Sequence, residues 1–225
     1  MKNKAKKYKF KYPIAATDII IFTVDSSKLK VLLIKMKKSP FLNHWACPGG
    51  LVRTDESVES SAKRQLKEKT GVTNVYLEQL YTFGEVNRDP FGRVISVSYF
   101  ALVPSKNLIL RTTKEYGGVE WFPVDKLPSL AYDHKNIIKY ALQRLRYKLE
   151  YTNVVWSLLP KEFTLSELQK VYKIILDKKL DKRNFRKKIL SLKILKKTGG
   201  KKYAAHRPAE LYTFKSHKPE IVKII

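Results

Sequence analysis

Short apolar runs alternate with turn residues in the first part of the chain. Residues 15–24 and 30–36 are rich in β-branched and other apolar side chains, and the segment Asp25-Ser26-Ser27 separates them. Runs of this kind bounded by turn residues are typical of a β-hairpin. The same kind of pattern predicts further strands at residues 75–83, 94–103 and 119–122.

Two other stretches in this part have the period of a helix. In residues 56–70 the apolar side chains of Val58, Ala62 and Leu66 recur every four positions, and Gly71 follows as a stop. Asp133 is a candidate cap for a second helix, over residues 134–148. The buried stripe predicted for that helix is Ile137, Ile138, Ala141, Leu142 and Leu145. Strands enclosing helices predict an α/β/α sandwich over residues 13–150.

Beyond residue 150 the pattern of apolar and polar residues changes and predicts two short helices. Thr164 and Glu167 have the spacing of a capping box. The apolar stripe of the helix that follows them is Leu165, Leu168, Val171, Tyr172 and Ile175. The next helix, over residues 181–192, places Phe185, Ile189 and Leu192 on one face and mostly basic residues elsewhere.

A basic ribbon follows the second of these helices. Residues 194–198 and 211–214 can pair as two strands, with a turn at Gly199-Gly200 and a loop over residues 201–208. Two short helices and such a wing predict a winged helix-turn-helix domain over residues 151–225. The fold class is therefore α+β, a sandwich followed by a winged helix-turn-helix.

The charge of the chain indicates a polyanionic partner. Lys and Arg number 46 against 20 Asp and Glu, which gives a formal net charge of +26. Nucleic acid is the leading partner for such an excess, and an anionic membrane is the second. A generally lysine-rich proteome is the alternative explanation, so the position of the charge has to decide. Residues 1–12 form a basic tail, which we expect to be solvated.

Other features of composition indicate the compartment. Cys47 is the single cysteine, so no internal disulfide can form. The chain has neither a signal-like apolar segment after the basic start nor the roughly 18–20 apolar residues that span a bilayer. We therefore expect a cytoplasmic protein.

A motif with fixed spacing begins at Trp45. The letters WACPGG end at Gly50, and the motif continues with Glu56, Arg64, Glu68, Gly71 and Val72. This register resembles the box of the Nudix hydrolases, Gx5Ex7REUxEExGU, in which U is aliphatic. The resemblance implies a helix whose carboxylates hold divalent cations against a pyrophosphate.

The carboxylate positions of that box are degenerate in this chain. They are occupied by Gln65, Glu68 and Lys69, and Lys69 by itself changes the charge by about two units against cation binding. We expect no bound metal, no cofactor and no catalytic residue. The remnants of the box are Glu56, Arg64, Gln65, Glu68 and Lys69. Surface ion pairs among Glu56, Arg64 and Glu68 are the purely structural alternative.

A polar loop over residues 83–94 carries two arginines. The guanidinium groups of Arg88 and Arg93 suit phosphate or carboxylate groups, although Arg88 and Asp89 can equally pair with each other in a turn. With the WxxPGG segment and the degenerate box, this loop is similar to the Nudix-related transcriptional regulators of NrtR type, many of which control NAD metabolism in response to ADP-ribose. The effector-binding residues that this resemblance implies are Arg53, Arg64, Glu68, Arg88, Asp89 and Arg93.

The C-terminal part is similar to the winged helix of the same regulators, through residues 158–160, 163–169 and 180–186. Between residues 178 and 202, twelve Lys or Arg stand against the single acid Asp181. This concentration favours double-stranded DNA as the partner. Candidates for base edges or nearby phosphates are Arg183, Asn184, Arg186 and Lys187. Candidates for backbone or minor-groove contacts are Lys188, Lys201, Lys202, His206 and Arg207, and Lys182 completes the predicted set.

The resemblance therefore implies a repressor of NAD metabolism genes that senses ADP-ribose or a related phosphorylated nucleotide. We expect a homodimer on a palindromic operator, because one winged helix buries limited DNA surface. We expect no membrane contact. An active Nudix pyrophosphohydrolase on ADP-ribose is the alternative function, and a sugar such as arabinose is the alternative effector. An RNA-binding or membrane-surface protein is a third interpretation, which the helix order disfavours.

Overall fold

The computed structural model describes residues 12–71, 73, 75–104, 116–203, 208–222 and 224. The chain divides into two compact units. The N-terminal unit holds most of the chain up to Ala141. The C-terminal unit holds the chain from Leu142 onward, together with Thr23–Leu29 and residues 103 and 104. Of the predicted basic tail only Tyr12 lies within the described residues, and the domain boundary after residue 150 stays a prediction.

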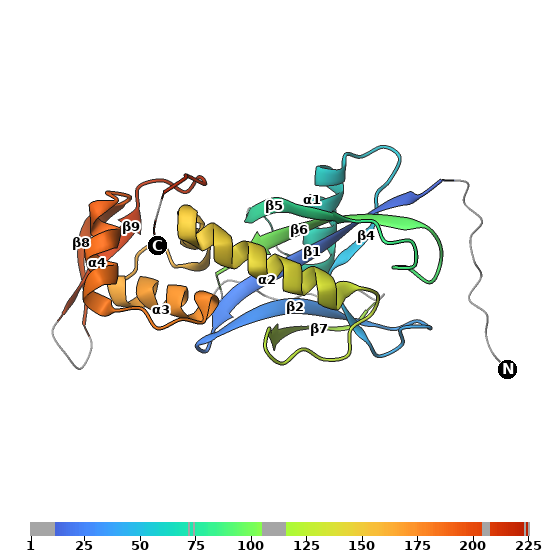
Figure 1. The fold of residues 1–225 in the computed structure, drawn as a ribbon, viewed down its shortest axis with the longest axis horizontal. Coiled ribbons are helices and arrows are strands. Elements are labelled where there is room, and N and C mark those ends of the chain that lie inside the picture. Colours follow the sequence, from blue (N-terminus) through green and yellow to red (C-terminus); the bar gives the residue numbers. More distant parts are fainter. Residues whose placement is uncertain are drawn as a thin grey trace. The chain divides into compact units, whose positions relative to one another are not determined.

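The N-terminal unit is built on a seven-stranded sheet (Figure 1). The order of the main path is β3-β2-β1-β6-β5, with β4 on β1 and β7 on β2. The strands are β1 (Ile14–Asp25), β2 (Lys28–Met36), β3 (Trp45–Ala46), β4 (Gly49–Leu51), β5 (Tyr76–Phe83), β6 (Val94–Leu102) and β7 (Tyr116–Pro123). β1 is parallel to β6 and is fully buried from Ile19 to Phe22, as its apolar run predicts.

Two strands of this sheet were not predicted. β3 and β4 lie on either side of Pro48, in a segment whose sequence indicates only a break. Both are too short for a periodic signal and are defined by their pairing with β2 and β1. The strand predicted at 119–122 is longer than expected, because β7 pairs with β2 as far as Tyr116.

Helix α1 (Val58–Thr70) begins two residues later than predicted. Ser57 is its N-cap and accepts a hydrogen bond from the Ser60 amide, so Glu56 lies before the helix. The stop at Gly71 is confirmed, since this residue has a φ of 74° and closes the last turn on the Lys67 carbonyl.

Helix α2 (His134–Tyr151) buries Ile137, Ile138, Ala141 and Leu145 of the predicted stripe. Leu142 is only half-buried, and Leu149 is buried in addition. In Figure 1 this helix is drawn across the strands of the sheet. At 18 residues it is the longest described helix. Neither it nor any other helix among the described residues is long and apolar enough to cross a membrane.

The C-terminal unit has the predicted helix-turn-helix and wing. Its elements are the 3-10 helix η2 (Val154–Leu158), α3 (Leu165–Leu176), α4 (Lys182–Ser191), β8 (Leu195–Lys202) and β9 (Ala209–Phe214). The capping box of Thr164 and Glu167 is formed in full. The core joins the two helices, because the buried rings of Tyr172 and Phe185 lie 5.3 Å apart between centroids.

The turn predicted at Gly199-Gly200 is wrong. β8 continues through both glycines to Lys202, and its register against β9 shifts between Lys197 and Lys201. Gly199 has a φ of 81°, so the extra residues are absorbed as a bulge rather than a turn. The connection between the two strands therefore begins after Lys202, which makes the wing longer than the sequence suggests.

Candidate functional site

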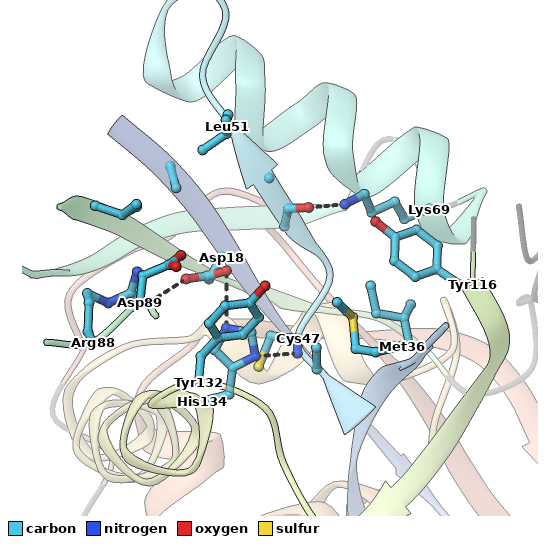
Figure 2. Close-up of a pocket in the computed structure, with 16 residues that line it drawn as sticks. Asp18, Met36, Cys47, Leu51, Lys69, Arg88, Asp89, Tyr116, Tyr132 and His134 are labelled. Carbon is cyan, nitrogen blue, oxygen red and sulfur yellow. Dashed lines mark hydrogen bonds and ion pairs between the residues drawn. The ribbon is translucent and has the colours of Figure 1, made fainter. Parts of the chain in front are cut away.

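A cavity of about 230 Å³ opens in the N-terminal unit, and sixteen residues line it (Figure 2). Asp18 of β1, Arg88 and Asp89 of the β5–β6 loop, and Tyr132 and His134 at the start of α2 gather on one side. Lys69 of α1 and Tyr116 of β7 lie on the other side, with Met36 below them in the view. The cavity thus has an acidic end, defined by Asp18 and Asp89, and a cationic end, defined by Lys69.

The glycines of WACPGG form the wall between these two ends. Gly49 of β4 stands opposite Asp18 of β1 in the antiparallel pairing. A Cβ atom on Gly49 would lie 2.4 Å from the Thr17 carbonyl oxygen and 2.5 Å from Asp18 Oδ1. On Gly50 it would lie 2.5 Å from the side-chain nitrogen of Gln65. Glycine at position 49 therefore lets this strand approach the backbone of β1, and Gly50 leaves room for the Gln65 side chain of α1.

A buried ion network forms the base of the acidic end. Arg88 makes a bidentate pair with Asp133, at 3.0 Å from Nε to Oδ2 and 2.7 Å from Nη2 to Oδ1. Its Nη2 also lies 3.2 Å from Asp18 Oδ2, which accepts a second hydrogen bond from Ser96 Oγ at 2.6 Å. Burial opposes ionisation of Asp18, but His134, Ser96 and Arg88 together lower its pKa to about 2.

His134 connects this network to the WACPGG segment. The Cys47 backbone N–H donates to His134 Nδ1 at 2.9 Å, so in the neutral ring the proton belongs on Nε2. His134 Nε2 in turn lies 3.4 Å from Asp18 Oδ1. Burial, with the charges of Asp18 and Asp133, raises the pKa of the Cys47 thiol well above its usual value. Cys47 is therefore an inert part of the wall rather than a nucleophile.

Three charged remnants of the Nudix box, Glu56, Arg64 and Glu68, pair with one another. Arg64 binds Glu56 through Nε at 2.8 Å and Nη2 at 2.5 Å, and its Nη1 lies 3.1 Å from Glu68 Oε2. The hydrogen bonds from Arg64 hold the pKa of Glu56 at about 2. This is the arrangement that the structural alternative predicts for the three charged residues, and none of the three lines the cavity.

The remaining two box positions do not suit a divalent cation. Gln65 is 5% exposed, and its Oε1 has no hydrogen-bond partner among the described residues. Lys69 Nζ donates to the Gly49 carbonyl and lies 4.9 Å from the centroid of the Tyr116 ring. In the described part of the chain, no group of three or more His, Cys, Asp or Glu side chains could hold a metal ion.

The predicted effector residues are divided by the structure. Arg88 and Asp89 line the cavity, and they do not form the turn pair considered as an alternative, because Arg88 pairs with Asp133 and Asp18 while Asp89 accepts from the Phe91 amide. Arg93 donates to the Gly84 and Glu85 carbonyls at 2.8 and 3.2 Å and holds the loop. The predicted residues outside the cavity lining are Arg53, Arg64, Glu68 and Arg93, whose effector contacts stay predictions.

The sequence does not single out several residues that line the cavity or form its ion network. Asp18 carries the clearest signal, as a single carboxylate inside the apolar run AATDIIIF. Asp133 was considered as a helix cap, whereas its carboxylate accepts hydrogen bonds from Arg88. Tyr132 has a φ of 53°, a conformation that is costly for a non-glycine residue and is concentrated at functional sites. His134 and Tyr116 give no signal that distinguishes them from ordinary core and surface residues.

A second candidate site is the basic surface of the C-terminal unit. α4 buries Phe185 and Ile189 and exposes the predicted residues Lys182, Arg183, Asn184, Lys187 and Lys188. Asp181 caps the helix by accepting from the Asn184 amide at 2.7 Å. Helical spacing places Arg183 and Lys187 on the face opposite Phe185.

Other members of the predicted DNA-binding set have different surroundings. Arg186 is half-buried and donates to Ser166 Oγ at 3.3 Å. Lys202 pairs with Glu167 of α3 at 2.5 Å, which ties the wing to the capping box, while Lys201 is exposed. His206 and Arg207 lie outside the described residues.

Both units resemble known proteins. Residues 13–145 match the NUDIX domain, and residues 155–214 match the NrtR DNA-binding winged helix domain. The chain is 37% identical over 213 residues to the ADPR responsive transcriptional repressor NtrR of Acinetobacter baylyi, covering 93% of this chain and 85% of that protein.

Two solved structures of Shewanella oneidensis NrtR also match the chain. Shewanella oneidensis NrtR in complex with a 27mer DNA matches with a TM-score of 0.80 at 36% identity, over 89% of this chain and 93% of that one. The NUDIX domain of Shewanella oneidensis NrtR in complex with ADP ribose matches with a TM-score of 0.55 at 38% identity, over 60% of this chain and 90% of that one.

Proposed function

Because the chain belongs to the NrtR family, in which a Nudix domain is joined to a DNA-binding winged helix domain, we propose that it is a transcriptional repressor controlled by ADP-ribose. Residues 13–150 form the sensor and residues 151–225 the DNA-binding domain. The protein acts as a homodimer on a palindromic operator of NAD metabolism genes. The observation that carries this proposal is the presence, in one chain, of an exposed cationic α4 and a cavity without a metal-ligand cluster among the described residues.

The charge and exposure of α4 support operator binding. Arg183, Asn184 and Lys187 are exposed near the start of a helix whose other face is anchored by Phe185. Residues in the first turns of a recognition helix reach base edges in the major groove, and Arg and Asn pair there with guanine and adenine. Lys188 and Lys201 are exposed, and in this proposal they contact phosphates, which position the protein without specifying sequence.

The two ends of the cavity support a nucleotide sugar as effector. Asp18 and Asp89 offer carboxylate oxygens that accept hydrogen bonds from ribose hydroxyls, and Tyr132 and Tyr116 offer rings for apolar or stacking contacts. A phosphate group is repelled by the two carboxylates and attracted to the Lys69 end. A sugar without phosphate, such as arabinose, would use only the acidic end.

ADP-ribose should therefore weaken binding of the full chain to its operator, by about 5–150-fold in Kd if the coupling has the usual size. An operator duplex is first selected with the protein itself and labelled. Its binding is then measured by fluorescence anisotropy at increasing concentrations of ADP-ribose, and a parallel titration uses arabinose. Such a switch requires that ADP-ribose binds the free protein and the operator-bound protein with different affinities. Equal affinity of ADP-ribose for free and operator-bound protein in calorimetry would contradict this switch.

The same proposal makes the domain a sensor rather than a hydrolase. With Mg²⁺, the purified protein should hydrolyse ADP-ribose no faster than the Glu68→Ala variant, because Lys69 brings an ammonium to a box position where the hydrolases carry a metal-binding carboxylate. Product release is followed by chromatography over a range of Mg²⁺ and Mn²⁺ concentrations. Metal-dependent turnover well above the variant would support the pyrophosphohydrolase alternative.

A further inference from the structure

The basic side chains at the acidic end of the cavity are both engaged by carboxylates. Arg88 is held by Asp133 and Asp18. His134 faces Asp18 through Nε2, which carries the proton in the neutral ring. Asp89 lines the same end and adds a third carboxylate against the single guanidinium. The net charge of this end is therefore negative.

The two carboxylates that line the cavity differ in how far they are engaged. Asp18 has partners at both oxygens, since Oδ2 accepts from Ser96 Oγ at 2.6 Å and Oδ1 faces His134 Nε2 at 3.4 Å. Asp89 accepts from the Phe91 amide at 2.8 Å through Oδ1, and this is its one hydrogen bond in the described part of the chain. Asp89 Oδ2 is therefore the oxygen with capacity for a ligand.

Tyr132 brings a hydroxyl group to the same end. Its ring packs against Phe41 and His134, at 4.4 and 5.1 Å between centroids, and points into the cavity (Figure 2). Burial, with the charges of Asp89 and Asp18, raises the pKa of Tyr132 to about 12, so the phenol keeps its proton at neutral pH. The hydroxyl has no hydrogen-bond partner among the described residues, and it can donate to a ligand.

A carboxylate and a phenol hydroxyl at one end of a cavity suit a sugar diol. Each sugar hydroxyl can donate one hydrogen bond and accept others, so one can donate to Asp89 Oδ2 while its neighbour accepts from Tyr132. A phosphate dianion offers acceptor oxygens alone, and at this end it meets the carboxylates of Asp89 and Asp18. The acidic end therefore favours an unsubstituted ribose over a phosphorylated one.

We propose that Asp89 and Tyr132 recognise one ribose of the effector through its neighbouring free hydroxyls, and that they reject effectors with a phosphate on that ribose. The inference rests on the proposed function, since it takes ADP-ribose as the ligand. ADP-ribose has two riboses, one in adenosine and one at the other terminus, and the same chemistry suits either of them. The ribose bound at this end is identified by which phosphorylated analogue is rejected.

Calorimetric titrations of the full chain test this discrimination. ADP-ribose is compared with two analogues, one with a 2′-phosphate on the adenosine ribose and one with a 2″-phosphate on the terminal ribose. One of the two should bind the wild type at least about tenfold more weakly than ADP-ribose, because like charges brought together in a binding site are strongly unfavourable. Asp89→Asn should recover much of the affinity for that analogue, since it removes one of the two repelling charges.

Binding of ADP-ribose itself tests the two hydrogen bonds. Asp89→Asn should weaken it by roughly 5–10-fold, because a hydrogen bond to a charged group is about twice as strong as one between neutral groups. Tyr132→Phe keeps the ring contacts and should weaken it by roughly 3–10-fold. The matched controls Asp125→Asn and Tyr140→Phe change exposed residues outside the cavity lining and should bind like the wild type. Thermal unfolding of each variant establishes that it is folded.

The outcomes separate the two levels of the proposal. If neither phosphorylated analogue binds more weakly than ADP-ribose, or if Asp89→Asn leaves the weakening unchanged, the inference is overturned while ADP-ribose remains the effector. The same holds if Asp89→Asn and Tyr132→Phe bind ADP-ribose as well as their controls. If the wild type does not bind ADP-ribose, both the effector assignment and the roles of Asp89 and Tyr132 are overturned.

Discussion

Replacing Arg183 and Lys187 together by alanine should weaken operator binding by roughly thirtyfold or more, because each base-edge contact contributes about 1–3 kcal/mol. The two side chains are four residues apart on α4, are exposed, and face away from the Phe185 and Ile189 core. Their removal should leave folding intact. The effect is measured by anisotropy titrations of a selected operator and of a scrambled duplex across a salt series. The preference of the protein for the operator over the scrambled duplex should decrease together with its affinity for the operator.

Two controls separate recognition from general charge. Lys63→Ala with Lys67→Ala removes the same charge at the same spacing from exposed positions of α1, and should change operator binding little. Lys201→Ala in the wing should weaken binding to both duplexes alike. It should also reduce the slope of log affinity against log salt concentration by about one. If the double substitution in α4 left affinity and slope unchanged in a folded protein, the assignment of α4 as the recognition helix would be wrong.

Replacing Arg88 by methionine should lower the free energy of unfolding by about 3–5 kcal/mol, the usual cost of removing one partner from a buried ion pair. Arg88 is 8% exposed and joins Asp18 to Asp133. Methionine fills much of the volume but leaves two carboxylates without their shared cation. Because this network forms the acidic end of the cavity, we expect ADP-ribose binding to be lost as well. Urea unfolding measures the first effect and calorimetry the second.

Arg93→Met is the matched control for this prediction. Arg93 belongs to the same loop, but its described contacts are to the Gly84 and Glu85 carbonyls on the exposed surface. Its replacement should cost about 2 kcal/mol or less, because each of its two hydrogen bonds has a net value of about 1 kcal/mol. In the Arg88→Met background, Asp18→Asn should recover part of the lost stability, since it removes one uncompensated charge. Equal destabilisation by Arg88→Met and Arg93→Met would contradict the role given to the buried network.

The sequence by itself determined the features that depend on neighbours along the chain. The capping box of Thr164 and Glu167 and the stop at Gly71 both occur where local hydrogen bonding predicts them. The split of α4 into a buried Phe185 face and a basic face follows from helical spacing alone. Both folds were therefore recognisable, and so was the charge reversal at Lys69.

The tertiary structure alone decided the features that depend on register across strands. The short strands β3 and β4 have no pattern of their own and exist through pairing with β2 and β1. The wing passes through Gly199-Gly200 as a bulge, because the pairing of β8 with β9 resumes at Lys201. Turn-forming residues show where a strand can bend, but cross-strand hydrogen bonds determine whether it turns.

The same reason limits what the sequence says about the cavity. Asp18, Arg88 and Asp133 come from β1, a loop and the start of α2, and they meet only because the sheet brings these three segments together. Their charges attract through space at about 3 Å, whereas sequence patterns report on spacing along the chain. The residue types for an anionic nucleotide were visible from the start, but only folding assigned Arg88 to the buried network and Lys69 to the opposite wall.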